Sequence, residues 1–375
     1  MFDLNDRPRY RLAPLVALVA ASLWTASAPA QDGAKGPKKP IEISPLAKEL
    51  ANALNTNGKT VVAMGTFVGP AQSNASAGSA IQFGLIEELK ARGIAVKKKE
   101  AEWGIVGRYR LADDDKGAMG VEIEARIEDR VGTEFFSIKW NLSDEPSIVS
   151  LFGPTVALPL DKGEDARKKV LRESIVAPKA NIKGTRVAAE KESPYAVEIA
   201  LLKDDDSLTP PLTPVDDEGL AFVPIKRGQR YAVTLVNDSD EDAAVTVTID
   251  GLNIFAFSKN KDYKHVILPK NSKGTIKGWH RTNEKSDSFL ITELAKGAAA
   301  ELGVSSGDVG TITASFAAAW PKDKRPPVAD RPLLASRGAG NATARGPEIR
   351  AKFEEVERRV GSTRAVVSIR YDKAK

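Results

Sequence analysis

Two short motifs in the second half of the chain carry side chains suited to binding. Residues 250–253 (DGLN) combine an Asp-Gly pair, typical of a tight turn with positive φ, with an asparagine that can cap the following turn. Residues 279–281 (WHR) place an aromatic ring beside a cation, a combination that anchors protein partners. One hypothesis is a binding edge made of Asn253, Trp279, His280 and Arg281. The alternative is a purely structural turn, with Trp279 in the core.

Residues for catalysis are scarce. The chain has two histidines, His265 and His280, no cysteine and no Gly-x-Ser-x-Gly elbow. Nucleophilic catalysis by serine needs a histidine and a carboxylate that converge on it, and nothing in the spacing indicates such convergence. We therefore predict no catalytic residues and no cofactor. The alternative is an exported hydrolase with a site between two domains.

The motifs for phosphate and calcium binding are incomplete. Residues 58–60 (GKT) end like a phosphate loop, but Ala53 stands where that loop needs glycine. Residues 238–242 (DSDED) resemble the first calcium ligands of an EF-hand, but Ala243 and Ile249 replace the glycine and glutamate that such a loop requires. The patterns favour a helix end and a hairpin turn, and we predict no metal site.

The N-terminus has the layout of a cleaved secretory signal. Three arginines precede an apolar run at 12–24, and residues 28–30 (APA) suit a signal peptidase. The run is shorter than the roughly 20 residues that span a bilayer, so we expect no transmembrane segment after cleavage. The predicted location is the periplasm or the cell surface.

Composition narrows the possible partners. The 375 residues carry a net charge of +5, spread along the chain, and the longest basic run is 97–99 (KKK). Nucleic-acid binders concentrate such charge on one face, so we predict no nucleic-acid partner. The lack of cysteine excludes disulfides, thiolate metal sites and the lipid anchor of lipoproteins.

Periodicity predicts an α+β fold of two domains. Leu46, Leu50 and Leu54 form one helical stripe, and residues 121–128 (VEIEARIE) alternate as a strand whose outward charges can pair with those of its neighbours. A later series of short strands separated by turns is typical of a β-sandwich. The predicted organisation is a signal peptide at 1–30, a linker at 31–43, an α/β domain with a mixed sheet at 44–177, a linker at 178–194, an antiparallel β-sandwich at 195–320 and a flexible linker at 321–347.

The last segment, 348–375, is predicted to complete the sandwich. Ile349, Phe353, Val356 and Val360 recur at helical spacing, so we expect an amphipathic helix over 349–360. Alternation over 365–371 (AVVSIRY) then predicts a strand. A lone helix and strand bury too little surface to be stable alone, so both should dock on the sandwich.

The first domain resembles a known group of exported domains. The segments SPLAKELANALNTNGKTVVAMGTF, AIQFGLIEELKARGIAV, GIVGRYRLADDD and EARIEDRVG follow the pattern of the curli secretion channel family and the flagellar outer-membrane FlgO family. The resemblance implies a periplasmic or outer-membrane α/β interaction module without catalytic residues. The chain lacks the lipidated cysteine of those families and any evident membrane-inserting hairpins, which argues against a secretion pore.

The second domain resembles uncharacterised exported bacterial domains with an antiparallel sheet. YAVTLVNDSDEDAAVTVTIDGLNIFAF, IKGWHR, AKGAAAELG and DVGTITASFAAAW carry that likeness, which implies a fold and a compartment. Together the patterns predict a non-enzymatic envelope protein that acts by protein–protein interaction in the assembly of an envelope structure. Its partners are envelope proteins, and a homo-oligomeric ring is a further hypothesis.

Overall fold

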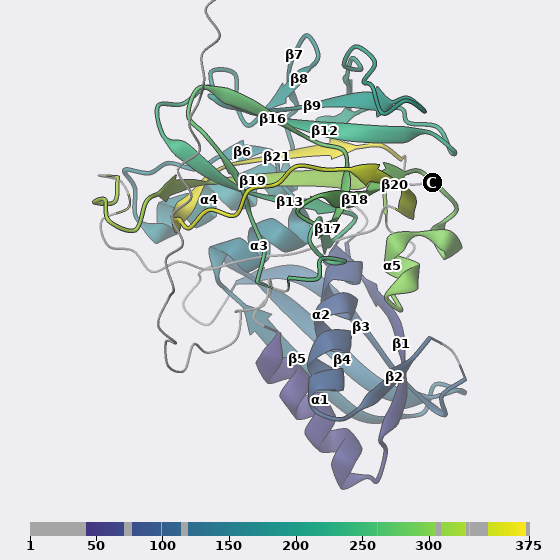
Figure 1. Ribbon diagram of the computed structural model, residues 1–375. Coiled ribbons are helices and arrows are strands. Elements are labelled where there is room, and N and C mark those ends of the chain that lie inside the picture. Colours follow the sequence, from purple (N-terminus) through teal and green to yellow (C-terminus); the bar gives the residue numbers. More distant parts are fainter. Residues whose placement is uncertain are drawn as a thin grey trace, which may run out of the picture. The chain divides into compact units, whose positions relative to one another are not determined.

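The computed structural model describes residues 43–70, 77–98, 100–113, 119–260, 262–304, 309–327, 330 and 344–372. The predicted signal at 1–30 and nearly all of the first linker lie outside these ranges, as does most of the linker at 321–347. The fold is α+β, as predicted, with three sheets (Figure 1).

The first sheet is mixed and has the strand order β2-β1-β3-β4-β5. β1 pairs in parallel with β2 and β3, whereas β3, β4 and β5 form an antiparallel meander. Helices α1 and α2 lie against one face of the sheet (Figure 1). The bounds are α1 (Ser44–Thr56), β1 (Val61–Val68), α2 (Ala77–Ala91), β2 (Ala95–Lys97), β3 (Trp103–Asp113), β4 (Met119–Asp129) and β5 (Glu134–Leu142).

The opposite face of this sheet carries paired charges. Val121, Ile123, Ala125 and Ile127 of β4 are fully buried under the helices, and the residues between them point outward. Arg108 and Glu124 lie directly opposite each other on β3 and β4 and form an ion pair of 2.7 Å. The predicted cross-strand pairing of the outward charges is confirmed. Each such exposed pair contributes only a few tenths of a kcal/mol.

The next elements connect the first sheet to the sandwich. They are α3 (Glu145–Phe152), β6 (Val156–Ala157) and α4 (Glu164–Val176), and β6 pairs with the C-terminal strand β21. Arg167 of α4 donates to both carboxylate oxygens of Glu145, at 2.8 and 2.6 Å, and to the carbonyl of Thr363 on β21 at 2.8 Å. A buried arginine therefore ties α3 and α4 to β21.

Two sheets of eight strands form the predicted sandwich. One has the order β10-β11-β21-β19-β13-β14, with β15 on β13 and β6 on β21; the other has the order β17-β18-β12-β9-β8-β7, with β16 on β12 and β20 on β18. Pairing is antiparallel except between β11 and β21. The bounds are β7 (Asn181–Lys183), β8 (Arg186–Ala188), β9 (Tyr195–Leu202), β10 (Val215–Asp217), β11 (Leu220–Phe222), β12 (Arg230–Asn237), β13 (Asp242–Ile249), β14 (Leu252–Asn253), β15 (Val266–Leu268), β16 (Ser272–Ile276), β17 (Gly278–Thr282), β18 (Lys285–Leu290), η1 (Leu294–Lys296), α5 (Ala298–Glu301), β19 (Thr311–Trp320), β20 (Ala344–Arg350) and β21 (Arg359–Arg370).

The structure differs from the prediction in two segments. The expected linker at 178–194 contains β7 and β8, a hairpin whose second strand pairs with β9. The expected helix over 349–360 is wrong. β20 ends at Arg350, residues 351–358 have no regular secondary structure, and β21 begins at Arg359. Because β20 pairs with one sheet and β21 with the other, the chain must cross between them here.

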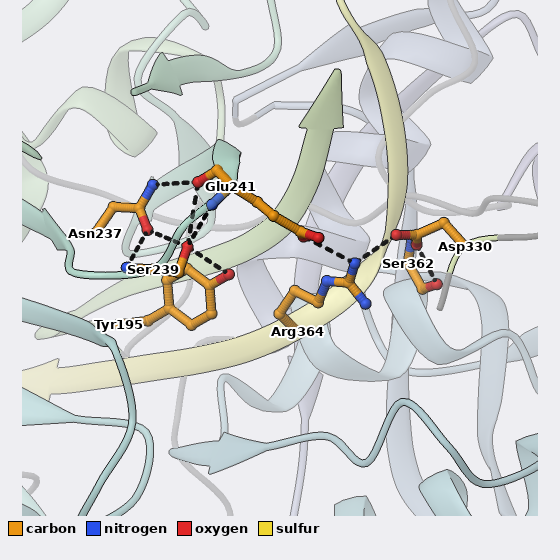
Figure 2. Close-up of polar contacts among 7 residues, drawn as sticks. All are labelled: Tyr195, Asn237, Ser239, Glu241, Asp330, Ser362 and Arg364. Atoms are coloured by element: carbon orange, nitrogen blue, oxygen red, sulfur yellow. Dashed lines mark hydrogen bonds and ion pairs between the residues drawn. The ribbon is translucent and has the colours of Figure 1, made fainter. Parts of the chain in front are cut away.

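A buried ion pair between Arg364 of β21 and Asp330 holds strand β21 in place. Asp330 accepts hydrogen bonds from the backbone N–H and the hydroxyl of Ser362, both at 2.9 Å, and from Arg364 (Figure 2). Arg364 also contacts Glu241 at 3.2 Å. Gly361 makes this approach possible, since a Cβ there would lie 2.3 Å from the Asp330 carboxylate.

Candidate functional site

A groove of about 820 Å³ lies where β15 and β16 meet the segment that joins β20 to β21. We call residues 351–358 (AKFEEVER) the strap. One wall of the groove consists of strap residues, and the other contains Val266 and Ile267 of β15 and Thr275 and Ile276 of β16. Its volume falls within the roughly 300–1,000 Å³ of ligand pockets.

Four rings form the aromatic end of the groove. Phe255, Tyr263 and Phe353 surround His280, with ring centroids 5.0, 5.4 and 4.9 Å from the imidazole. Tilted and edge-to-face contacts at such distances are favourable. Phe353 belongs to the strap, so ring packing fixes the strap at this point.

His280 is held in one orientation. Its Nδ1 lies 3.1 Å from the Ser258 hydroxyl and its Nε2 lies 3.3 Å from Oδ1 of Asn283. An amide oxygen only accepts, so Nε2 carries the proton and Nδ1 accepts from Ser258. Burial lowers the pKa of His280, and only 1% of the residue is exposed. The imidazole is therefore neutral at pH 7.

Hydrogen bonds and ion pairs hold both ends of the strap. The Phe353 N–H donates to the carbonyl of Asn283 at 2.9 Å, and Arg358 pairs with Asp242 at 3.4 Å. The Tyr263 hydroxyl donates to Glu355 at 3.0 Å. Between these anchors, the backbone of 354–357 makes no backbone hydrogen bond to another described residue. Apart from the Glu357 carbonyl, which accepts from the Arg358 guanidinium at 3.1 Å, the middle of the strap thus presents an open backbone.

The two strands on the other wall also have open edges. Among the described residues, β16 pairs only with β12 and β15 pairs only with β13. Each therefore has a second edge without a ladder partner. Unpaired strand edges are templates for another chain.

The lining has a small excess of negative charge. It contains five carboxylates (Asp242, Asp262, Glu354, Glu355, Glu357) and four cations (Lys264, Lys322, Lys352, Arg358). Three of the cations have carboxylate partners within the lining: Lys322 with Glu357, Lys352 with Glu354 and Arg358 with Asp242. Within the described part of the chain, no cation lies at ion-pair distance from Glu355.

The structure separates the four residues of the predicted binding edge. Asn253 accepts from the Phe255 N–H through its side chain, as a turn cap does, and donates to the carbonyl of Lys264. Trp279 is fully buried between Phe257 and Phe289. It therefore lies in the core, as the alternative to a binding role had it. A partner at the surface therefore cannot contact its ring.

The other two predicted residues have different surroundings. His280 is one of the residues that line the groove, whereas Arg281 is partly exposed and pairs with Asp287 at 3.1 Å. Asp287 also accepts from Arg345 of β20, at 2.7 Å. Arg281 thus helps to attach β20 to the sheet. Of the predicted set, His280 alone lines the groove.

One arrangement bears on the hydrolase hypothesis. Ser258, His280 and Asn283 form a hydrogen-bonded row, which is the order of groups in serine and cysteine hydrolases. Ser258 is 1% exposed, however, and its hydroxyl already accepts from the Asn260 N–H at 3.1 Å. This geometry is that of a turn-stabilising serine behind the groove.

Comparison with known proteins assigns no family. The chain matches no protein-family model, no curated protein and no solved structure. None of the helices in the described ranges has the length and apolar character that crossing a membrane requires.

Proposed function

We propose that this chain is a non-enzymatic, exported envelope protein that acts by binding a protein partner in the groove. The main supporting observation is a groove that combines an aromatic end and paired charges with open backbone on both of its walls, among the residues that the structure describes. Partner segments bind at such edges in many recognition modules. The resemblance of 44–142 to exported interaction domains supports the same compartment and role, in the assembly of an envelope structure.

Site-specific photo-crosslinking tests the proposal. Val356 lies on the strap, lines the groove and is 47% exposed, so a benzoylphenylalanine in its place reaches an occupant. Ser137, on the exposed side of β5, is the matched control position. In cells that produce the chain, we expect one discrete protein adduct from position 356 and none of that mass from position 137. The same adduct from both positions, or none from either, would contradict the proposal.

Export is tested separately. Mass spectrometry of the protein from an envelope fraction should give a mature N-terminus at Gln31. A chain that is recovered from the cytosol with residues 1–30 attached would contradict the proposed compartment.

The hydrolase alternative has its site between the two domains. A different hydrolase hypothesis, with a site inside the second domain, would use the row Ser258–His280–Asn283. Hydrolysis of p-nitrophenyl esters by the purified protein, abolished in both Ser258→Ala and His280→Gln while the circular dichroism spectrum is unchanged, would establish it. We expect no turnover above that of the two variants, because the Ser258 hydroxyl is buried.

A further inference from the structure

The occupant of the groove can be specified further, on the basis of the proposed function. We propose that the groove receives an extended segment of the partner, which pairs with the open edge of β16 and places a lysine or arginine side chain beside Glu355 and Tyr263.

The shape of the groove argues for an extended segment. A chain that lies along β16 finds one open backbone edge in β16 and faces the open backbone of 354–357 on the strap. Successive N–H groups of an extended peptide point in opposite directions, so it can donate to both walls. A helix satisfies its own backbone groups and would leave both edges unpaired.

The apolar surface argues for alternating side chains. Gly274 and Ile276 of β16 point into the sandwich, whereas Lys273 and Thr275 point outward. Val266 and Ile267 of β15, which are partly exposed, provide the apolar lining beside this edge. A segment in register with β16 would therefore place every second side chain on apolar surface and the others in solvent.

Charge argues for a basic side chain at the aromatic end. Glu355 accepts from Tyr263 and has no cationic partner among the residues that the structure describes. The rings of Tyr263 and Phe353 lie beside it, and aromatic faces attract lysine and arginine cations. A carboxylate with adjacent rings thus favours a cation over an anion on the occupant.

Synthetic peptides test the occupant directly. The probe is a capped seven-residue peptide of alternating threonine and valine with lysine in place of the central valine, and its partner probe has glutamate there. We expect the lysine probe to bind about fivefold tighter by amide NMR titration, since one exposed ion pair and one cation–π contact together have about that effect. Glu355→Gln should reduce the preference to less than about twofold. Glu348→Gln, on β20 outside the groove lining, is the matched control and should preserve it.

Backbone pairing is tested on the probe, which leaves the protein intact. Two further lysine probes carry N-methyl groups on alternate amides. In one probe the odd-numbered amides are methylated, and in the other the even-numbered amides are methylated. Each set of amides faces one wall, so both probes should bind at least tenfold more weakly.

Equal binding of the lysine and glutamate probes, or undiminished binding of both N-methylated probes, would overturn the inference. Failure of every probe to bind would also overturn it. If the crosslink from position 356 still forms in any of these cases, the proposed function stands and the occupant is of another kind. If the crosslink is also absent, both proposals fail.

Discussion

Asp250 should make the stability of this protein fall as the pH rises. The residue is 1% exposed, and its carboxyl accepts hydrogen bonds from the backbone N–H groups of Gly310 and Thr311 and lies against the Tyr371 hydroxyl. Burial raises the pKa of Asp250 to about 8 from an ordinary value of 3.8, against the three hydrogen bonds, which lower it. A carboxyl held neutral in the folded state is ionised in the unfolded chain above pH 4. The contribution of Asp250 to the free energy of unfolding is therefore fully present below pH 4 and is lost as the pH rises from 4 through 8.

The magnitude follows from linkage. Between pH 5 and pH 8 the unfolded chain has lost the proton and the folded state retains it, so stability falls by about 1.4 kcal/mol per pH unit, or up to about 4 kcal/mol. Asp250→Asn replaces the neutral acid with a neutral amide, whose oxygen can accept from Gly310 and Thr311 and whose nitrogen can donate to Tyr371. The backbone at this position has a φ of 47°, which asparagine tolerates well.

Urea unfolding at pH 5 and pH 8.5 tests this reasoning. The stability of the variant relative to the wild type should increase by several kcal/mol between pH 5 and pH 8.5, because only the wild type has a carboxyl to titrate at this position. Asp323→Asn, at an exposed position, is the control for general charge effects and should show no such difference. If the difference between Asp250→Asn and the wild type were the same at both pH values, burial would not keep Asp250 neutral and the reasoning would be refuted.

Three further predictions concern stability. Asp330→Ala should lower the free energy of unfolding by about 3–5 kcal/mol, because it leaves the buried Arg364 cation without its main partner; the exposed Asp323→Ala should change it little, and a similar loss for both would contradict the assignment. Gly361→Ala should cost about 1–3 kcal/mol by overpacking against Asp330 and Trp320, as measured by thermal unfolding. Arg108→Ala should change the free energy by no more than about 0.5–1 kcal/mol in the same assay, since its ion pair is exposed.

The sheets were largely predictable from the sequence because their pattern is strictly local. Each strand of the meander β3–β4–β5 alternates over about eight residues, and its neighbour follows after a short turn. Period-two alternation then determines which side chains are buried, as for Val121 and Ile123. The pairing of Arg108 with Glu124 follows from the same alternation.

The binding groove was less predictable because its residues come together only through long-range contacts. Phe255, Tyr263 and Phe353 come from three separate segments, and Phe353 lies 73 residues beyond His280. The sequence around His280 contains no local pattern that predicts a cluster with rings from other segments. For Trp279 the sequence left a binding role and a core position open, since a tryptophan in a strand is suited to both, and in the structure its side chain is buried.

The strap links the failed helix prediction to the proposed function. Residues 349–360 have helical spacing and favourable i,i+4 charge pairs, yet 351–358 form neither helix nor strand. The ends of the segment explain this result. Ile349 pairs with Ser286 in one sheet and Val360 with Ala319 in the other, and a continuous helix between them would remove both ladders.

A segment whose local preference conflicts with its tertiary setting is expected at functional sites. Here the conflict leaves the backbone of 354–357 without backbone partners among the described residues, beside the open edge of β16. Because an added strand would pair with that backbone, the occupant would stabilise the conformation that the strap already has. Binding should therefore raise the protection of the amides of 354–357 from hydrogen exchange, whereas a ligand that contacts only the aromatic end would leave those amides unchanged.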